Sequence, residues 1–261
     1  MKRLIYQVYI GKRSNLYDFC TESVRRYADS IGADYICQSK PILRITPDPF
    51  NTDRIGTTGG WKKLGYMPIF EKENIFNHFP DYDQCCVIDA DIYIKENTPS
   101  IFEQLHGTVA SVYEGDLPIN KKYRDKITQY ANMMLKPLSD VEWEWGKNGG
   151  MFFNSGVMLY DSKKMMDVIK NKSPKQILDS YYLKDLVDGK GPFKWQSDQI
   201  TLNYFFKKEG IEVQKLDWRW NALYTALEGD KHKESHFFHF FLRDLLPEKG
   251  ENIQELLEEI L

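Results

Sequence analysis

Residues 85–94 read Cys-Cys-Val-Ile-Asp-Ala-Asp-Ile-Tyr-Ile, the most informative stretch of the sequence. An apolar, β-branched run leads into two carboxylates one residue apart and then resumes, which is typical of a buried strand. Residues i and i+2 of a strand point to the same side, so Asp89 and Asp91 are expected to converge. Buried carboxylates are costly unless a cation neutralises them, and hard cations prefer oxygen ligands. The pair therefore predicts a metal site with room for the phosphates of a substrate.

A second interpretation of Asp89 and Asp91 is that they only end a strand. Asp is common in turns, and a lone Asp-x-Asp motif occurs there without binding a metal. The rest of the sequence has to decide between these two interpretations.

The composition is that of an ordinary globular protein. The 261 residues are 42% hydrophobic and 28% charged, which suits a single domain with a substantial core. The net charge of -3 gives no reason to expect nucleic acid as a partner. Aromatic residues make up 14% of the chain, enough for a core and for a surface on which sugar rings could stack.

The four cysteines argue against a disulfide scaffold. Cys20, Cys37, Cys85 and Cys86 contain no Cys-x-x-Cys pair, which favours a reducing, cytoplasmic environment. The apolar run over residues 4–10 is short and is followed by Gly-Lys-Arg, so we expect a first strand and not a signal peptide. No apolar run approaches the length of a transmembrane helix.

The N-terminal part alternates between strand and helix patterns. Residues 3–10 and 34–37 are expected to form strands, and residues 16–31 between them repeat apolar positions at a helical period. A β-α-β beginning implies a parallel sheet. Further helices are predicted over residues 61–79, 99–102, 121–135, 161–170, 174–187, 196–209 and 251–261. Further strands are predicted over residues 109–113, 151–160, 211–216 and 234–241, and a mobile rim loop around residues 146–150.

Four separated motifs complete the pattern: Asp89-Ala90-Asp91, Phe153-Asn154-Ser155-Gly156-Val157, Ser197-Asp198-Gln199 and His239-Phe240-Phe241. With Lys63-Leu64 at the start of a helix, their order and spacing resemble the glycogenin-like, family 8 glycosyltransferases. The resemblance runs from about residue 3 to about residue 242. It implies an A-type glycosyltransferase fold, a single α/β domain over residues 1–261 with a Rossmann-like, mostly parallel central sheet flanked by helices. About residues 1–100 would bind the nucleotide, and about residues 101–261 would shape the sugar and acceptor site and end in a helix.

The resemblance also implies a metal site made by Asp89, Asp91 and His239, the last from a late strand. Such a set suits Mn²⁺ better than Mg²⁺, because imidazole favours transition metals. His236 is a competing candidate. Side chains three apart on a strand point to opposite faces, so only one of the two histidines can meet the aspartates.

The remaining residues implied by the resemblance bind the donor or take part in catalysis. Asp198 and Asn154 are the catalytic candidates, with Asp198 near the anomeric carbon. The competing interpretation of Asp198 is a helix N-cap. The donor-binding set that it implies is Lys63, Asp89, Ala90, Asp91, Asn154, Ser155, Asp198 and Gln199. Tyr9, Ile10 and Tyr17 are further donor-binding candidates, on the nucleotide side, where residues 11–17 lack a close copy of the family's nucleotide-binding segment.

One departure from the family pattern follows the late histidine. The family has a Gly and then a Lys that contact the diphosphate, whereas this chain continues Leu242-Arg243-Asp244. Arg243 or Lys249 would have to supply the missing positive charge.

The resemblance implies transfer of a hexose-type unit from a nucleoside diphosphate sugar, with UDP as the expected carrier and Mn²⁺ or Mg²⁺ as cofactor. The acceptor would be a glycan, a protein or a small molecule, and the anomeric configuration would be retained. A sugar-phosphate nucleotidyltransferase is one alternative, but it would need a glycine-rich basic loop after the first strand. Residues 11–13, Gly-Lys-Arg, resemble such a loop only faintly. A carbohydrate-binding protein without catalysis is another, and it leaves the two aspartates and the histidine unexplained.

Overall fold

A computed structural model describes residues 1–54, 60–170 and 172–260. Its strands are β1 (Arg3–Val8), β2 (Asp34–Gln38), β3 (Gln84–Ile88), β4 (Ile92–Ile94), β5 (Val109–Tyr113), β6 (Trp145–Gly146), β7 (Gly149–Gly150), β8 (Phe153–Asp161), β9 (Val213–Lys215), β10 (Ala222–Leu223) and β11 (Phe237–His239). Its α-helices are α1 (Asn15–Ser30), α2 (Trp61–Leu64), α3 (Lys121–Leu135), α4 (Ser162–Ile169), α5 (Pro174–Leu178), α6 (Lys184–Asp188), α7 (Asp198–Lys208) and α8 (Ile253–Ile260). The 3₁₀ segments include η2 (Pro68–Asp81), η3 (Ile101–Gln104), η4 (Glu114–Asp116), η5 (Gly191–Trp195) and η6 (Trp218–Asn221).

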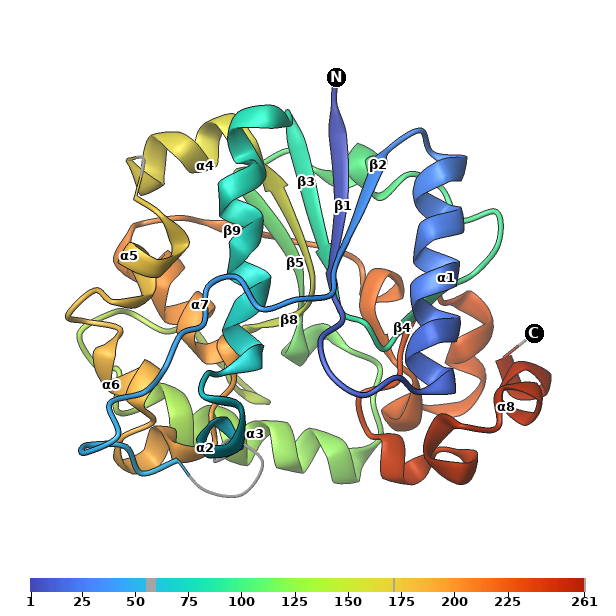
Figure 1. The fold of residues 1–261 in the computed structure, drawn as a ribbon. Coiled ribbons are helices and arrows are strands. Elements are labelled where there is room, and N and C mark those ends of the chain that lie inside the picture. The colour runs from blue at the N-terminus through green and yellow to red at the C-terminus, as the bar shows by residue number, and fades with distance from the viewer. Residues whose placement is uncertain (55–59, 171, 261) are drawn as a thin grey trace.

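Six strands form the central sheet in the order β2-β1-β3-β8-β5-β9. β1 pairs in parallel with β2 and β3, and β5 with β9, whereas β8 is antiparallel to both of its neighbours. The sheet is therefore mostly parallel, as the sequence predicts. Ligands bind beyond the carboxyl ends of the strands in open sheets of this kind. β1 and β3 run downward in Figure 1, so these ends face the lower centre of the molecule in that view.

Helices flank the sheet, and α1 and α4 are amphipathic, each with one buried face. The hydroxyl of Ser14 accepts the N–H of Tyr17 and caps α1, which packs beside β2 and β4. Segment η2 packs against α4 and against strands β1 and β3, and α7 packs on β8. Figure 1 shows the resulting α/β arrangement, with α1 on one side and α4, α5 and α7 on the other.

The prediction of one continuous strand over residues 85–94 is wrong. β3 ends at Ile88, and residues 89–91 leave the central sheet before β4 begins at Ile92. β4 belongs to a second sheet of order β10-β11-β4, in which it pairs antiparallel with β11. The two aspartates therefore lie at the junction between two sheets, and strand alternation is not what brings them together.

Three other boundaries also differ from the prediction. The helix predicted over residues 61–79 is divided, because Gly65 takes a left-handed φ of 76° and Pro68 begins a new segment. The helix predicted over residues 174–187 separates into α5 and α6, and the strand predicted over residues 234–241 shortens to β11. The other predicted elements are confirmed to within a few residues at their ends.

The expected rim loop and the C-terminal tail both contain regular structure. β6 and β7 pair antiparallel within the segment expected to be a mobile loop. α8 confirms the predicted tail helix, and its Leu256 is buried in a small apolar cluster with Leu16 and Cys20 of α1. Leu261 lies outside the described residues. No helix among the described residues is long and apolar enough to cross a membrane.

Candidate active site

Three side chains from two sheets meet beyond the carboxyl end of β3. Asp89 and Asp91 lie in the β3–β4 junction, and His239 ends β11. His239 Nε2 lies 3.4 Å from Asp91 Oδ1 and 3.9 Å from Asp89 Oδ2. Two backbone hydrogen bonds hold the junction: the Asp89 N–H donates to the Gly156 carbonyl at 2.8 Å, and the Phe240 N–H donates to the Asp91 carbonyl at 2.9 Å.

These three side chains form a group that could hold a single divalent cation. Oxygen and nitrogen ligands lie about 2.0–2.2 Å from such ions, so two ligands of one ion are at most about 4.4 Å apart. Both distances from the His239 ring satisfy this limit. Ligand atoms of the three side chains all lie within 4.8 Å of one another, and no second group of this kind occurs among the described residues.

His236, the competing candidate, lies elsewhere. Its ring centroid is 4.8 Å from that of Trp220, and its backbone N–H donates to the Arg219 carbonyl at 3.0 Å. The structure thus brings His239, and not His236, to the two aspartates.

The three candidate ligands influence one another's protonation. Burial raises the pKa of Asp89, and the nearby Lys72 ammonium only partly opposes this. Burial also favours the neutral form of Asp91, but His239 outweighs it and lowers the pKa of that carboxyl. For His239, burial works against the charged ring, yet Asp91 and Asp89 raise its pKa above the ordinary value. The two carboxylates therefore need a positive partner, which an imidazolium or a bound cation can supply.

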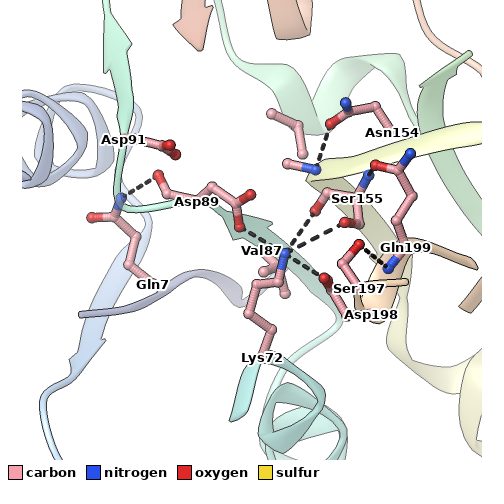
Figure 2. A network of polar contacts seen from close by, with 12 residues as sticks. Gln7, Lys72, Val87, Asp89, Asp91, Asn154, Ser155, Ser197, Asp198 and Gln199 are labelled. Carbon is pink, nitrogen blue, oxygen red and sulfur yellow. Dashed lines mark hydrogen bonds and ion pairs between the residues drawn. The ribbon is translucent and has the colours of Figure 1, made fainter. Parts of the chain in front are cut away.

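Lys72 is the central cation of the site, and sequence reasoning missed it. Its ammonium lies 2.8 Å from Asp89 Oδ1 and 2.7 Å from Asp198 Oδ2, with the carbonyl and hydroxyl of Ser155 at 3.4 and 3.5 Å. Figure 2 shows Lys72 between the β3–β4 junction and the start of α7. Burial opposes its charge, but the two carboxylates keep the pKa of Lys72 above the ordinary lysine value, so it remains an ammonium.

Lys63, which the family resemblance favours, is exposed on α2. From sequence alone, the Glu71-Lys72-Glu73 run looks like a solvated helix face, yet both glutamates are almost completely buried. Only the folded chain shows that Lys72 points into the site. Ala90 is half-buried between the two aspartates.

The start of α7 brings Asp198 and Gln199 to Lys72 and to β8. The helix is capped by Ser197, whose hydroxyl accepts the N–H of Gln199 at 3.3 Å. The interpretation of Asp198 as the N-cap is therefore wrong. Asp198 is only 5% exposed and pairs with Lys72, while the side-chain oxygen Oε1 of Gln199 accepts the N–H of Ser155 at 3.2 Å.

Asn154 lies in a buried polar network with Glu114 and Asn221, two residues that sequence reasoning also missed. Its Nδ2 donates to Glu114 Oε1 at 2.7 Å, and its Oδ1 accepts from Asn221 Nδ2 at 2.8 Å. Burial raises the pKa of Glu114, against the effect of hydrogen bonds from Asn154 and Gln199. Both missed residues lie in short 3₁₀ segments, η4 and η6, where no periodic pattern marks them.

Gly156 is required by the close approach of the histidine. A Cβ atom at this position would lie 2.7 Å from His239 Cε1 and 2.8 Å from its Nδ1. The glycine of the Asn-Ser-Gly segment thus lets the β11 imidazole pack directly against β8.

The residues expected on the nucleotide side gather beside the end of β1. Tyr9 is buried and makes an edge contact with Tyr17, with ring centroids 5.4 Å apart. Arg243 lies 4.9 Å from the centre of the Tyr17 ring and forms an ion pair with Glu251 at 2.7 Å. Ile10 is half-buried at the same strand end. Arg243 is therefore close to this side of the site, although Glu251 already holds its guanidinium.

No protein-family sequence model matches the chain, and no curated protein sequence matches it either. Solved structures do match. LgtC, a galactosyltransferase in complex with donor and acceptor sugar analogs, superposes with a TM-score of 0.56 over 98% of this chain and 96% of that chain. The chain has a glycosyltransferase fold.

Two further structures support this assignment of the fold. One is a glycosyltransferase involved in the glycosylation of the major capsid of PBCV-1, with a TM-score of 0.52 over 98% of this chain and 100% of that chain. The other is mouse xyloside xylosyltransferase 1 in its apo form, with a TM-score of 0.50 over 92% and 97%. Sequence identities are 13% to LgtC and 14% to these two. At such identities the likeness establishes the fold, and the activity has to be argued from the site.

Proposed function

We propose that this protein is a metal-dependent glycosyltransferase of the glycogenin-like type. It would transfer a hexose-type unit from a UDP-linked donor to a glycan, protein or small-molecule acceptor with retention of configuration. The observation that carries the proposal is the meeting of Asp89, Asp91 and His239 beside Lys72 and Asp198, at the strand ends of a glycosyltransferase fold. The named activity of LgtC, a galactosyltransferase, supports a hexose.

Asp89, Asp91 and His239 would hold the divalent cation. Two carboxylates with an imidazole suit Mn²⁺ better than Mg²⁺, because imidazole favours transition metals. When bound, the ion supplies positive charge that stabilises the departing diphosphate. Mn²⁺ is therefore the first metal to test and Mg²⁺ the second.

Lys72 contributes a second positive charge on the sugar side of these ligands. Its ammonium bridges Asp89 and Asp198, so it lies between the proposed diphosphate and sugar positions. A lysine ammonium is a compact charge with three donors, two of which face Asp89 and Asp198 here, so a third can turn toward a phosphate oxygen. We assign to it a diphosphate contact, in place of the donor contact that the family resemblance gave to Lys63.

Asp198 is proposed to stabilise the anomeric carbon. In the transfer, the acceptor hydroxyl oxygen forms a bond to that carbon while the bond from the carbon to the diphosphate oxygen breaks. The leaving diphosphate oxygen takes the hydroxyl proton, so no separate strong base is required. Attack and departure on the same face retain the configuration. The carbon is most cationic in the transition state, where a buried carboxylate such as Asp198 is most effective.

The two parts of the chain would contribute residues to different sides of this site. About residues 1–100 supply the expected nucleotide contacts Tyr9, Ile10 and Tyr17 together with the two aspartates. About residues 101–261 would supply Asn154, Ser155, Asp198 and Gln199 on the sugar side.

The cytoplasmic location stays a prediction from cysteine usage.

Donor hydrolysis tests the proposal without knowledge of the acceptor. A panel of UDP- and GDP-sugars is incubated with the protein, with Mn²⁺ or with a chelator, and the released nucleotide is measured. We expect release of UDP that requires Mn²⁺ and is lost in Asp91→Asn. Release of pyrophosphate would instead identify a nucleotidyltransferase. Sugar binding with no turnover of any donor would identify a carbohydrate-binding protein.

A further inference from the structure

A buried network of side-chain hydrogen bonds leads from the proposed metal site into the protein. His239 Nδ1 lies 2.9 Å from Asn221 Oδ1, Asn221 Nδ2 donates to Asn154 Oδ1 at 2.8 Å, and Asn154 Nδ2 donates to Glu114 Oε1 at 2.7 Å. None of the four side chains belongs to a residue more than 7% exposed. We call these four residues the amide network. They come from β11, η6, β8 and η4, so only the tertiary fold assembles them.

The direction of every bond in the amide network is determined. The backbone N–H of Gly156 donates to Asn154 Oδ1 at 2.8 Å, and an N–H can only donate to the oxygen of an amide. Asn154 therefore turns its nitrogen toward the Glu114 carboxylate, which accepts. Because Asn154 offers an oxygen to Asn221, Asn221 must offer its nitrogen in return. The oxygen of Asn221 is then left for His239.

This order determines the tautomer of the histidine. An amide oxygen can only accept, so Nδ1 of His239 must carry a hydrogen. The neutral ring then has its lone pair on Nε2, the nitrogen that lies 3.4 Å from Asp91 and 3.9 Å from Asp89. An imidazole binds a metal through an unprotonated nitrogen, and a hydrogen bond to the other nitrogen selects which one is available.

We propose that Asn221 and Glu114 are positioning residues for the metal site, which act through Asn154 to hold His239 in the Nδ1–H tautomer with Nε2 facing the aspartates. The inference rests on the proposed metal-dependent function. It also gives Asn154 a role through His239, since its amide oxygen and nitrogen are both engaged in the amide network. Gln199 Nε2 also donates to Glu114, at 3.4 Å. The Glu114 carboxylate therefore accepts hydrogen bonds both from Asn154, which leads to the proposed metal site, and from Gln199 on the proposed sugar side.

The tautomer is tested first, on metal-free wild-type protein. Histidines are labelled with ¹⁵N, and NMR at alkaline pH reports which ring nitrogen carries the hydrogen. The chain has five histidines, and the spectrum of His239→Ala identifies the signals of His239. We expect the Nδ1–H form. A predominant Nε2–H form would overturn the proposal.

Metal affinity is tested next, with Mn²⁺ alone as the probe and the free ion measured by EPR. Asn221→Leu should weaken Mn²⁺ binding by about 10–100-fold, the usual cost of losing a hydrogen-bond partner of a metal-bound histidine. Asn74→Leu is the matched control. Asn74 is also buried and donates to Tyr6 and Gln38, away from the amide network. The Asn74→Leu variant should have a lower melting temperature than wild type but the same Mn²⁺ affinity. Wild-type affinity in folded Asn221→Leu would refute the proposal.

A pair of Glu114 variants keeps the test decisive if Asn221→Leu does not fold. Glu114→Gln retains an oxygen that accepts from Asn154, so its Mn²⁺ affinity should stay within a few-fold of wild type. Glu114→Leu removes that acceptor and should lose about tenfold or more. Equal affinity in both variants would remove Glu114 from the proposal. A wild-type protein that binds no Mn²⁺ refutes the proposed function itself, whereas normal wild-type binding with unaffected variants refutes only the amide network.

Discussion

Replacing Glu73 by glutamine should stabilise the metal-free protein above neutral pH. Glu73 is 2% exposed, and among the described residues neither of its carboxylate oxygens has a hydrogen-bond partner. Burial, and then the charge of Asp198, raise the pKa of Glu73 from 4.5 to about 8, although Lys72 opposes this. The carboxyl is therefore protonated in the folded protein at neutral pH and ionised in the unfolded chain.

The sign and size of the effect follow from this difference in proton binding. An acid whose pKa is raised by folding contributes stability that is complete below the unfolded value of 4.5 and is lost as the pH rises to about 8. Each pH unit in this window costs about 1.4 kcal/mol. Between pH 5 and pH 8 the loss is therefore at most about 4 kcal/mol, and glutamine, which does not titrate, avoids it.

Urea unfolding followed by tryptophan fluorescence at pH 5 and pH 8, with a chelator present, measures this difference. Glu73→Gln should be close to wild type at pH 5 and more stable by a few kcal/mol at pH 8. Glu71→Gln is the matched control, because Glu71 is equally buried but accepts four hydrogen bonds, from Gln38 Nε2 and from the N–H groups of Ile42, Leu43 and Arg44. Losing an acceptor there should destabilise the protein by about 1–3 kcal/mol. A stability difference for Glu73→Gln that does not change with pH would refute the reasoning.

Four further predictions concern the site. Asp91→Asn should keep the fold and lose metal-dependent donor turnover, because an anionic ligand is removed; near-normal turnover in the folded variant would exclude Asp91 from the metal site. His239→Ala should weaken Mn²⁺ binding in a titration while His236→Ala does not, and the reverse order would make His236 the ligand. Asp198→Asn should lower kcat strongly with little change in UDP affinity; early melting with normal turnover per folded molecule would make its role structural. Gly156→Ala should lower both the melting temperature and Mn²⁺ affinity, since its Cβ would lie 2.7 Å from His239 Cε1, and unchanged values would show that the ring can move away without loss.

The local pattern of the sequence predicts most of the fold. Alternating strand and helix signals over residues 3–38 identify the parallel sheet, and this prediction holds because apolar periodicity reflects which face each element buries. The Asp-x-Asp motif could also be singled out, since two carboxylates within an apolar run are costly unless a site explains them, whereas His239 followed from the family resemblance. The helix predicted over residues 174–187 breaks where the composition still looks helical, whereas Gly65 and Pro68 mark the break in the one predicted over residues 61–79.

The order of most elements and the glycosyltransferase fold were predictable from the sequence, as was a candidate site with two carboxylates and a histidine. The other residues that meet at this candidate site were not, because they come together only in the folded chain. β4 leaves the central sheet because it pairs with β11, a partner far along the chain. Lys72 is central, and not Lys63, because its charge is balanced by Asp89 and Asp198 from two other elements. Glu114 and Asn221 carry no local signal, because the role of a buried polar group depends on partners that only the folded chain brings within hydrogen-bond distance.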